Sequence, residues 1–558
     1  MRAWRAGWEK TGGKGRPMEA RCSARIGGML VVVAGLCAAV APPARADSHW
    51  KHTPTAPGDW LDDANWINGV PAPGDQAYVD NGGMAMIAAG EAFASALYLG
   101  YFDVGSVAQA GGTNVVDTLY LGWYEPAEGG YILDDGDLYA GTQEAVGVWS
   151  KGQFVQLGGA NATNELLLGW GPAAAGSYDL SGGSLTVRDG LVGSAGKDPE
   201  LPDGGGGGLT GTGVSFESVG VWGTGTFVQS GGIHDVNRLY VGWGQGSVGT
   251  YWFDGGSLMG TYEWVGVDGA GTFLQTGGTN QASSLFVGDG AGAVGNYDIG
   301  GGSLLVGSLE IGRDGQGGMT ILDGEATIAI TDLLRFGPQS TFAAAPGSAI
   351  HLAGARVENA STDPVALAGL ADLSLIFEGG ADLFSDFEVA GADMGSDPTA
   401  WTDNFALGVL QLGGVAPGRI RLVDYFINQP AWADGEALYV DGLVVNAGAA
   451  IDLNGLNLYY LNGGSPKQFF RGDSNLDGVI GYLDVETLSA WYNQPGTWGQ
   501  GDFDGDGFVG YLDVGVLSTN YGAQTPPGGA PQQTPEPAAL ATLAVGACLL
   551  FARRRRRK

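Results

Sequence analysis

The sequence predicts a mainly β protein, built as a parallel β-helix (a solenoid of stacked coils) with a small helical module near its C-terminal end. Glycine contributes 103 of 558 residues, so the backbone must turn often or pack closely, which favours short strands over long helices. Short β-rich runs such as LYVG, GTYWF and GTFVQ are separated by Gly-Gly or Gly-Ser turns. The third observation is a long internal repeat, and a chain with 44% apolar residues can give it a core.

The repeat has a period of 46 residues. ESVGVWGTGTFVQSGG (217–232) returns as EWVGVDGAGTFLQTGG (263–278), and EAVGVWSKGQFVQLGG (144–159) precedes both. The spacing between the copies that begin at Glu144 and Glu217 is larger than this period, which fits an insertion at about residues 194–215. Each unit divides near Gly242 into pieces of 22 and 24 residues, the size of one solenoid coil. We therefore expect a right-handed β-helix of some ten coils over residues 91–340, with a β-propeller as the alternative.

Both ends of the solenoid need a cap, because an open end exposes strand edges. GDWLDDANWINGVPAPGDQAYVD (58–80) resembles the opening of many exported bacterial β-solenoids, which implies that Trp60 and Trp66 cap the first coil. Residues 47–90 form this N-terminal cap. Beyond residue 340 the repeat fades into irregular β-like sequence, so residues 341–464 are expected to form a terminal β-region.

Residues 1–46 have the features of a secretory signal peptide. Seven basic residues precede an apolar run from Ile26 to Ala41, and Ala44-Arg45-Ala46 is an A-x-A cleavage site. The true start is Met1 or Met18. This segment predicts export.

Residues 535–558 form a second processing segment. Pro535-Glu536-Pro537 precedes an apolar run of 15 residues (538–552), which is short for a spanning helix, and a cluster of five arginines and Lys558 follows. This order resembles the PEP-CTERM sorting signal of Gram-negative-type bacteria, which implies an exosortase-type sorting enzyme as partner and removal of the tail. The tail would hold the chain at the membrane before processing, and residues 524–534 would be a Pro/Gly/Gln linker. A simple tail anchor is the alternative.

The charge and the cysteine content of the sequence exclude a nucleic-acid partner and sites built on thiols. The formal net charge is −33 and 14 of the 26 basic residues lie in the two processing segments, so a nucleic-acid partner is excluded. Such an acidic surface favours divalent cations. Cys22, Cys37 and Cys548 all lie in those segments, so the remainder has no thiols.

The repeats carry little catalytic chemistry. The G-x-G-x-x-G matches at 244–249 and 290–295 precede strands rather than helices, so they are turn glycines, and His234 has no partner at metal spacing. An acidic stretch is the candidate for a glycosidase or lyase site, since two carboxylates suffice for glycoside hydrolysis: Asp382, Asp386, Glu388, Asp393, Asp397 and Asp403. Basic residues are scarce beside it, so we expect no enzyme activity.

The sharpest chemical signal is a fourteen-residue segment present twice, GDSNLDGVIGYLDV (472–485) and GDFDGDGFVGYLDV (501–514). The oxygen donors at positions 1, 3, 5, 7 (a backbone carbonyl) and 12 match a twelve-residue calcium loop, in which odd-numbered residues converge on one point. Two Ca²⁺ ions are therefore expected, with ligands Asp473, Asn475, Asp477, Val479 and Asp484 in the first loop and Asp502, Asp504, Asp506, Phe508 and Asp513 in the second.

Position 12 is Asp where a helix-loop-helix EF-hand has Glu, and one short apolar helix follows each loop. With loops that begin at Asp473 and Asp502, the pair resembles a type I dockerin (a calcium module within residues 468–523), which implies a cohesin-like partner. The resemblance also implies partner contacts for the duplicated pairs Tyr482-Leu483 and Tyr511-Leu512. Packing of these residues between the two halves is the alternative.

These predictions describe an exported structural or adhesion protein of the cell surface or extracellular matrix. The first alternative is a polysaccharide lyase or glycoside hydrolase docked to a scaffold through its dockerin. The second is a non-catalytic protein that binds extracellular polysaccharide through exposed Trp170, Trp222, Trp243 and Trp264, which could equally be stacked ladder or turn aromatics.

Overall fold

The computed structural model describes residues 47–51, 57–189, 215–379 and 383–526. All of these residues belong to one compact unit. The predicted signal peptide, nearly all of the predicted insertion (194–215), most of the linker and the sorting motif at 535–537 lie outside the described residues.

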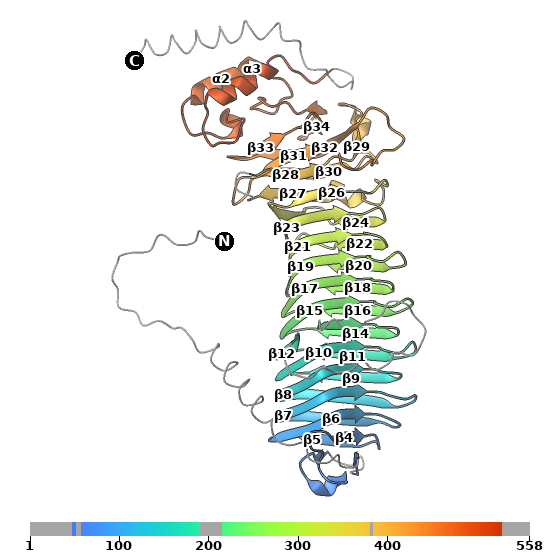
Figure 1. The fold of residues 1–558 in the computed structure, drawn as a ribbon. Coiled ribbons are helices and arrows are strands. Elements are labelled where there is room, and N and C mark those ends of the chain that lie inside the picture. Colours follow the sequence, from blue (N-terminus) through green and yellow to red (C-terminus); the bar gives the residue numbers. More distant parts are fainter. Residues whose placement is uncertain (1–46, 52–56, 190–214, 380–382, 527–558) are drawn as a thin grey trace, which may run out of the picture. The chain divides into compact units, whose positions relative to one another are not determined.

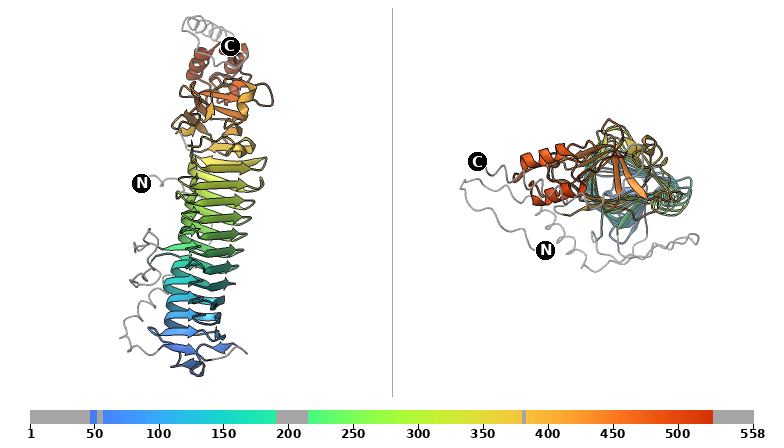
Figure 2. Two further views of the ribbon diagram at one scale, coloured as in Figure 1. Left: turned by 90° about the vertical axis from the view of Figure 1, so that its right-hand side faces the viewer. Right: turned by 90° about the horizontal axis from the view of Figure 1, so that it is seen from above.

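The described chain is mainly β and forms a β-solenoid of about 16 turns, with 51% strand and 8% helix. Successive coils pair in parallel, each strand with the equivalent strand one coil later (Figures 1 and 2). A propeller is excluded because its blades would pair as antiparallel strands.

The strands and short helices of the first half are β1 (Ser48–Trp50), β2 (Gly58–Asp59), η1 (Asp63–Asn65), β3 (Trp66–Ile67), β4 (Gln76–Val79), β5 (Met84–Ile87), β6 (Glu91–Leu99), β7 (Gly105–Leu121), β8 (Glu128–Val146), β9 (Lys151–Gln156), β10 (Ala160–Leu168), β11 (Ala175–Leu180), β12 (Ser184–Val187), β13 (Phe216–Val219), β14 (Thr224–Gln229), β15 (Ile233–Val241), β16 (Val248–Phe253), β17 (Ser257–Val265) and β18 (Ala270–Gln275). Those of the second half are β19 (Thr279–Val287), β20 (Val294–Ile299), β21 (Ser303–Ile311), β22 (Gln316–Ile321), β23 (Thr327–Phe336), β24 (Ser340–Ala344), β25 (Ser348–Ala353), β26 (Arg356–Asn359), η2 (Ala368–Asp372), β27 (Leu373–Glu378), β28 (Ser385–Glu388), β29 (Gly391–Ala392), η3 (Pro398–Trp401), β30 (Leu407–Leu412), β31 (Arg419–Val423), β32 (Glu436–Val445), β33 (Ala450–Asp452), β34 (Asn457–Tyr460), β35 (Lys467–Gln468), α2 (Tyr482–Trp491), η4 (Trp498–Gln500) and α3 (Tyr511–Asn520).

The register explains the long sequence repeat. Leu239 on β15 pairs with Glu263 on β17, one coil on, and Glu263 pairs with Leu285 on β19 after the next coil. One repeat is therefore two coils of unequal length. The division of each repeat into two unequal pieces was visible in the sequence.

A column of glycines lies at the first or second residue of one strand in each coil, where backbone atoms of neighbouring segments approach closely. A Cβ added to Gly225 would stand 2.0 Å from the backbone nitrogen of Gly220, and one added to Gly249 would stand 2.3 Å from that of Gly242. Only hydrogen fits there. The column, with each glycine paired to the next, is Gly105, Gly129, Gly152, Gly176, Gly225, Gly249, Gly271, Gly295 and Gly317.

Two residues after the seven glycines from Gly129 to Gly295, an aromatic side chain points inward and stacks on its counterpart in the next coil. Successive ring centroids lie 4.5 to 5.0 Å apart, nearly parallel, in the order Tyr131, Phe154, Tyr178, Phe227, Tyr251, Phe273 and Tyr297. All seven are fully buried. Stacks of this kind add to the burial of aromatic surface, so they tie each coil to the next.

At the N-terminal end, Trp60 and Trp66 are fully buried and pack edge to face at 4.7 Å. The indole N–H of Trp66 donates to the carbonyl of Trp60 at 2.8 Å. The strand that precedes Trp60, β2, pairs with β5, so the cap continues the coil hydrogen bonding.

Beyond residue 340, parallel pairing continues through β32 and β34, although the sequence repeat has faded. Hydrogen bonds between coils join backbone groups, so they persist without sequence identity. The last strand, β35, pairs antiparallel with β34.

Candidate functional site

The two duplicated loops have the same internal hydrogen bonds. Asp473 and Asp502, at position 1, are fully buried, and each accepts the backbone N–H of the glycine at position 6, at 2.8 and 3.0 Å. Asp477 and Asp506, at position 5, each accept the N–H of position 7, at 2.9 and 2.8 Å. Two loops of partly different sequence therefore fold in the same way, with their first carboxylates turned inward.

The carboxylates of the second loop converge. Oxygens of Asp502, Asp504 and Asp506 lie within 4.8 Å of one another. In the first loop, Asn475 supplies an amide oxygen at position 3, and its amide N–H donates to Asp477 at 3.0 Å. Burial and the neighbouring carboxylates raise the pKa of Asp473 and of Asp502 to about 6. Crowded hard oxygens fit Ca²⁺ in donor type, since calcium takes six to eight such ligands.

The aspartates at position 12 close their own loops. Asp484, in the first turn of α2, is buried and accepts the N–H groups of Ser474 and Gly481, both at 2.8 Å. Asp513 accepts those of Phe503 and Gly510, both at 2.7 Å. An ionised carboxylate has about four acceptor positions, so each retains capacity for a cation.

The duplicated Tyr-Leu pairs are exposed at the start of α2 and α3. Exposed fractions are 70% for Tyr482, 57% for Leu483, 79% for Tyr511 and 65% for Leu512. Large apolar side chains so exposed contribute little to packing between the helices. The core of the module contains other residues, including buried Leu488 and Leu517.

The acidic stretch does not converge on one point. Glu388 accepts backbone N–H groups of Tyr425 and Phe426, and Asp393 accepts the Tyr459 hydroxyl. Asp397 caps the short helix η3, and Asp403 is exposed. Asp382 lies outside the described residues. Asp386 accepts the Tyr425 hydroxyl at 3.0 Å, so it contacts the same residue as Glu388. The hydrogen bonds of Asp393 and Asp397 are made to other residues.

The four tryptophans considered for polysaccharide binding lie half-buried on the outer surface. Trp264 is stacked between Tyr240 and Phe286, at 4.7 and 5.4 Å. Trp243 packs against Tyr240 at 4.5 Å, while Trp170 and Trp222 pack against a small outer cluster around Val221. The Trp264 ring thus has neighbours on both faces, which leaves little ring face for a sugar.

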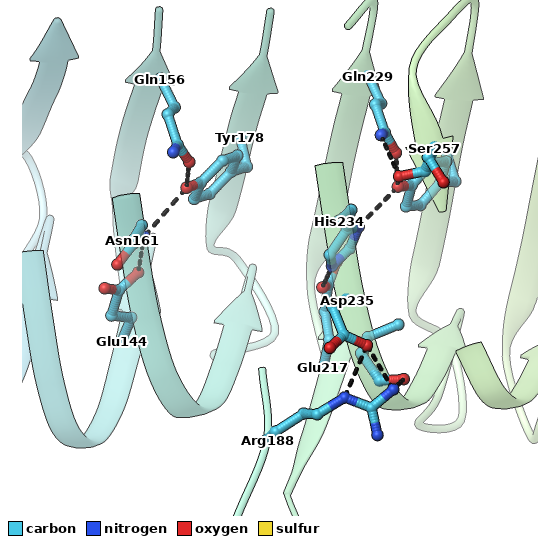
Figure 3. A network of polar contacts seen from close by, with 12 residues as sticks. Glu144, Gln156, Asn161, Tyr178, Arg188, Glu217, Gln229, His234, Asp235 and Ser257 are labelled. Carbon is cyan, nitrogen blue, oxygen red and sulfur yellow. Dashed lines mark hydrogen bonds and ion pairs between the residues drawn. The ribbon is translucent and has the colours of Figure 1, made fainter. Parts of the chain in front are cut away.

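The interior holds a polar network that recurs with the long sequence repeat (Figure 3). In one copy, Tyr178 donates its hydroxyl hydrogen to Gln156 Oε1 at 2.6 Å. The amide of Asn161 donates both to the Tyr178 oxygen and to Glu144 Oε2, each at 3.0 Å. Gln156 donates to the carbonyl of Ser184 at 2.9 Å. All four side chains of this copy are buried, with exposed fractions of at most 1%.

Further copies follow the same pattern, with substitutions. The first copy consists of Gln109, Asn114 and Tyr131 with Leu97 at the glutamate position; the third of Glu217, Gln229, His234 and Tyr251; the fourth of Glu263, Gln275, Asn280 and Tyr297. In the third copy His234 replaces Asn, its Nδ1 2.9 Å from the Tyr251 oxygen and its Nε2 2.8 Å from Glu217 Oε2. His234 is thus paired in the core.

Sequence reasoning missed this network, although its signal is present. Glu144, Glu217 and Glu263 begin the three aligned repeat segments at a position that alternation places inward, and a glutamine ends each FVQ or FLQ run. A charged residue recurring at an inward position indicates a buried partner.

No family model, curated protein or solved structure matches this chain. Within the part of the chain that the structure describes, none of the helices has the length and apolar character needed to span a membrane.

Proposed function

We propose that this chain is an exported structural or adhesion protein of the cell surface or extracellular matrix, whose C-terminal module binds two Ca²⁺ ions and a cohesin-like partner. The solenoid is its rigid body. An exosortase-type enzyme would process the tail, and calcium would order the two loops that present the partner surface.

The duplicated loop architecture carries this proposal. Both loops bury their first aspartate, bond their acidic side chains to their own backbone and direct a Tyr-Leu pair outward at the start of the following helix. Such symmetry exceeds what two unrelated turns would require. Exposed aromatic and aliphatic side chains that lie side by side are typical of a protein-binding surface.

The first experiment is a calcium titration of the full chain by calorimetry after chelation. Asp477→Ala and Asp506→Ala each remove an exposed position-5 carboxylate that accepts a neighbouring backbone N–H. Each variant should reduce the number of bound ions from two to one. Asp403→Ala, which removes an exposed carboxylate outside the loops, is the matched control and should bind two.

The partner step is tested with cohesin domains as probes, with and without calcium. Because the pairs are duplicated, Tyr482→Ala with Leu483→Ala should leave binding through the other pair, whereas replacement of all four residues should abolish it. Calcium stoichiometry unaffected by either aspartate variant would refute the metal site. Calcium binding without calcium-dependent cohesin binding would refute the partner.

A further inference from the structure

The interior carboxyl groups raise the question of where their protons reside. Glutamate is rarely buried without a cation, because an unpaired charge in the interior is strongly disfavoured. Glu144 and Glu263 lie fully buried, and the contact shown for each is an asparagine amide rather than a cation. In the coil register their immediate neighbours are leucines: Leu119 and Leu166 for Glu144, Leu239 and Leu285 for Glu263.

The direction of each hydrogen bond can be assigned from the backbone outward. Gln156 donates its amide hydrogens to carbonyls, so its oxygen faces Tyr178 and accepts the hydroxyl hydrogen. The tyrosine oxygen must then accept from Asn161, which fixes that amide with its nitrogen toward both Tyr178 and Glu144. The same reasoning fixes Asn280 in the fourth copy.

This assignment leaves two oxygens over in each copy. Among the described residues, Glu144 Oε1 and Asn161 Oδ1 have no hydrogen-bond partner, and neither have Glu263 Oε1 and Asn280 Oδ1. In Figure 3 the carboxyl of Glu144 and the amide of Asn161 face one another. Two acceptor oxygens side by side would repel, and buried polar atoms are rarely left unpaired.

We propose that Glu144 and Glu263 are protonated in the folded solenoid and that each forms a cyclic acid–amide pair with its asparagine. The carboxylic acid hydrogen on Oε1 is donated to the asparagine oxygen, while the asparagine N–H is donated to Oε2. One proton per copy satisfies both unpaired oxygens and leaves the interior uncharged.

The histidine copy fits the same rule. Tyr251 donates its hydrogen to Gln229, so His234 Nδ1 must donate to the tyrosine oxygen. The other ring nitrogen, His234 Nε2, then faces Glu217 Oε2 at 2.8 Å. Imidazole substitutes for the amide because it also presents one group to tyrosine and one to glutamate.

The groups that face the two carboxyls from neighbouring elements reinforce protonation. Glu144 faces Tyr178 and, further along the interior, Glu217; Glu263 faces Tyr297 and Tyr251. None of these is a cation. Burial raises the pKa of Glu144 and of Glu263 from 4.5 to about 7, and the asparagine contact opposes this only in part.

A consequence is that the coils around these sites weaken with rising pH. A carboxyl whose pKa is higher in the folded than in the unfolded state stabilises the fold, and this stabilisation is fully present at pH values below the unfolded-state pKa. It is lost as the pH rises through the folded-state pKa. With pKa values of 4.5 unfolded and about 7 folded, the local opening equilibrium should increase about 70-fold between pH 5 and pH 8 at each site.

The test compares the full wild-type chain with Glu144→Gln and Glu263→Gln by hydrogen exchange between pH 5 and pH 8. Glutamine reproduces the protonated acid, since its N–H₂ donates to the asparagine oxygen and its carbonyl accepts. The opening of each variant should not depend on pH, so the ratio of wild-type to variant opening in the strands around the site should grow about 70-fold between pH 5 and pH 8. Glu91→Gln, at an exposed glutamate on β6, is the matched control and should show no difference.

Variants that open faster than wild type by the same factor at every pH would show that the glutamates are ionised and would overturn the proposal. An unchanged pH dependence would also overturn it. Infrared spectroscopy at pH 5 compares wild type with the Glu144→Gln, Glu263→Gln double variant, because Glu388 and Glu436, whose pKa is also about 7, add to the same carboxylic acid carbonyl band. The band should be weaker in the variant than in wild type, and bands of equal intensity would refute protonation.

Discussion

The glycine column makes the strongest prediction about the solenoid, that Gly225→Ala breaks it while Gly130→Ala does not. A Cβ at Gly225 would stand 2.0 Å from Gly220 N and 2.7 Å from the carbonyl carbon of Val219. Ordinary contacts begin at 3.4 Å, so the two backbone segments would have to separate by about 1.4 Å. Overpacking costs about 1–3 kcal/mol when side chains can yield. Here both partners are backbone in hydrogen-bonded strands, so we expect a loss of about 3 kcal/mol or more.

Gly130 is the matched control because it follows the column residue Gly129 on the equivalent strand. A Cβ there meets only the Ser106 Cβ, at 3.5 Å, which is ordinary contact. Alanine should stabilise the chain by about 0.4–1 kcal/mol through the unfolded state. Urea unfolding of the full chain, followed by circular dichroism, measures both. Unfolding free energies of the two variants that agree to within about 0.5 kcal/mol, the range of an ordinary surface substitution, would refute the close-approach argument.

Three further predictions follow from the described contacts. Tyr178→Phe keeps a ring between Phe154 and Phe227 but leaves Gln156 and Asn161 without their shared hydroxyl, so it should cost about 1–3 kcal/mol in urea unfolding; a change below about 0.5 kcal/mol would contradict the network. Burial raises the pKa of Glu388 and Glu436 from 4.5 to about 7, and both accept backbone N–H groups of the loop at 425–429. A carboxyl with a raised pKa stabilises the folded state most below pH 4.5 and progressively less up to pH 7. The opening equilibrium constant of these amides, measured by hydrogen exchange and corrected for intrinsic rates, should therefore be larger at pH 8 than at pH 5. The opposite order would contradict the raised pKa. Alanine at Tyr482 and Leu483 removes exposed side chains, so unfolding should change by less than about 0.5 kcal/mol; a larger loss would place these residues in the packing of the module.

The solenoid could be predicted from the sequence because its constraints recur. A glycine column, an inward aromatic and a Gly-Gly turn return along the repeats, and the unequal coil lengths are visible in the shift between copies. The continuation past residue 340 could not, since backbone pairing there no longer needs matching side chains. In the loops, spacing alone identified the acidic positions. It did not reveal that Asp484 and Asp513 would bond to backbone N–H groups of their own loops, because that depends on where the helix begins.

The polar network also bears on how the coils find their register. The glycine column and the aromatic stack are nearly identical in successive coils, so they cannot distinguish a coil from its neighbour. Glutamate, asparagine and glutamine instead alternate with leucine, isoleucine or phenylalanine along each inward ladder, as in Leu239, Glu263 and Leu285. If the asparagine ladder slipped by one coil relative to the glutamate ladder, Leu138 or Leu185 would take the place of Asn161, and Glu144 would lose the amide that it bonds. We infer that the polar coils select the register, at some cost in stability.

This inference is testable by making one polar set apolar, as the alternate coils already are. The change is Glu144→Leu, Gln156→Leu, Asn161→Leu and Tyr178→Phe, which copies the residues at the matching positions of adjacent coils. Replacing a buried polar set by apolar residues of similar volume is often neutral or stabilising, so the unfolding midpoint should not fall. Register should become less uniform, giving more than one exchange population in β8 to β12. A single population with wild-type protection would show that register is set elsewhere, and a large loss of stability would show that the network contributes to stability directly.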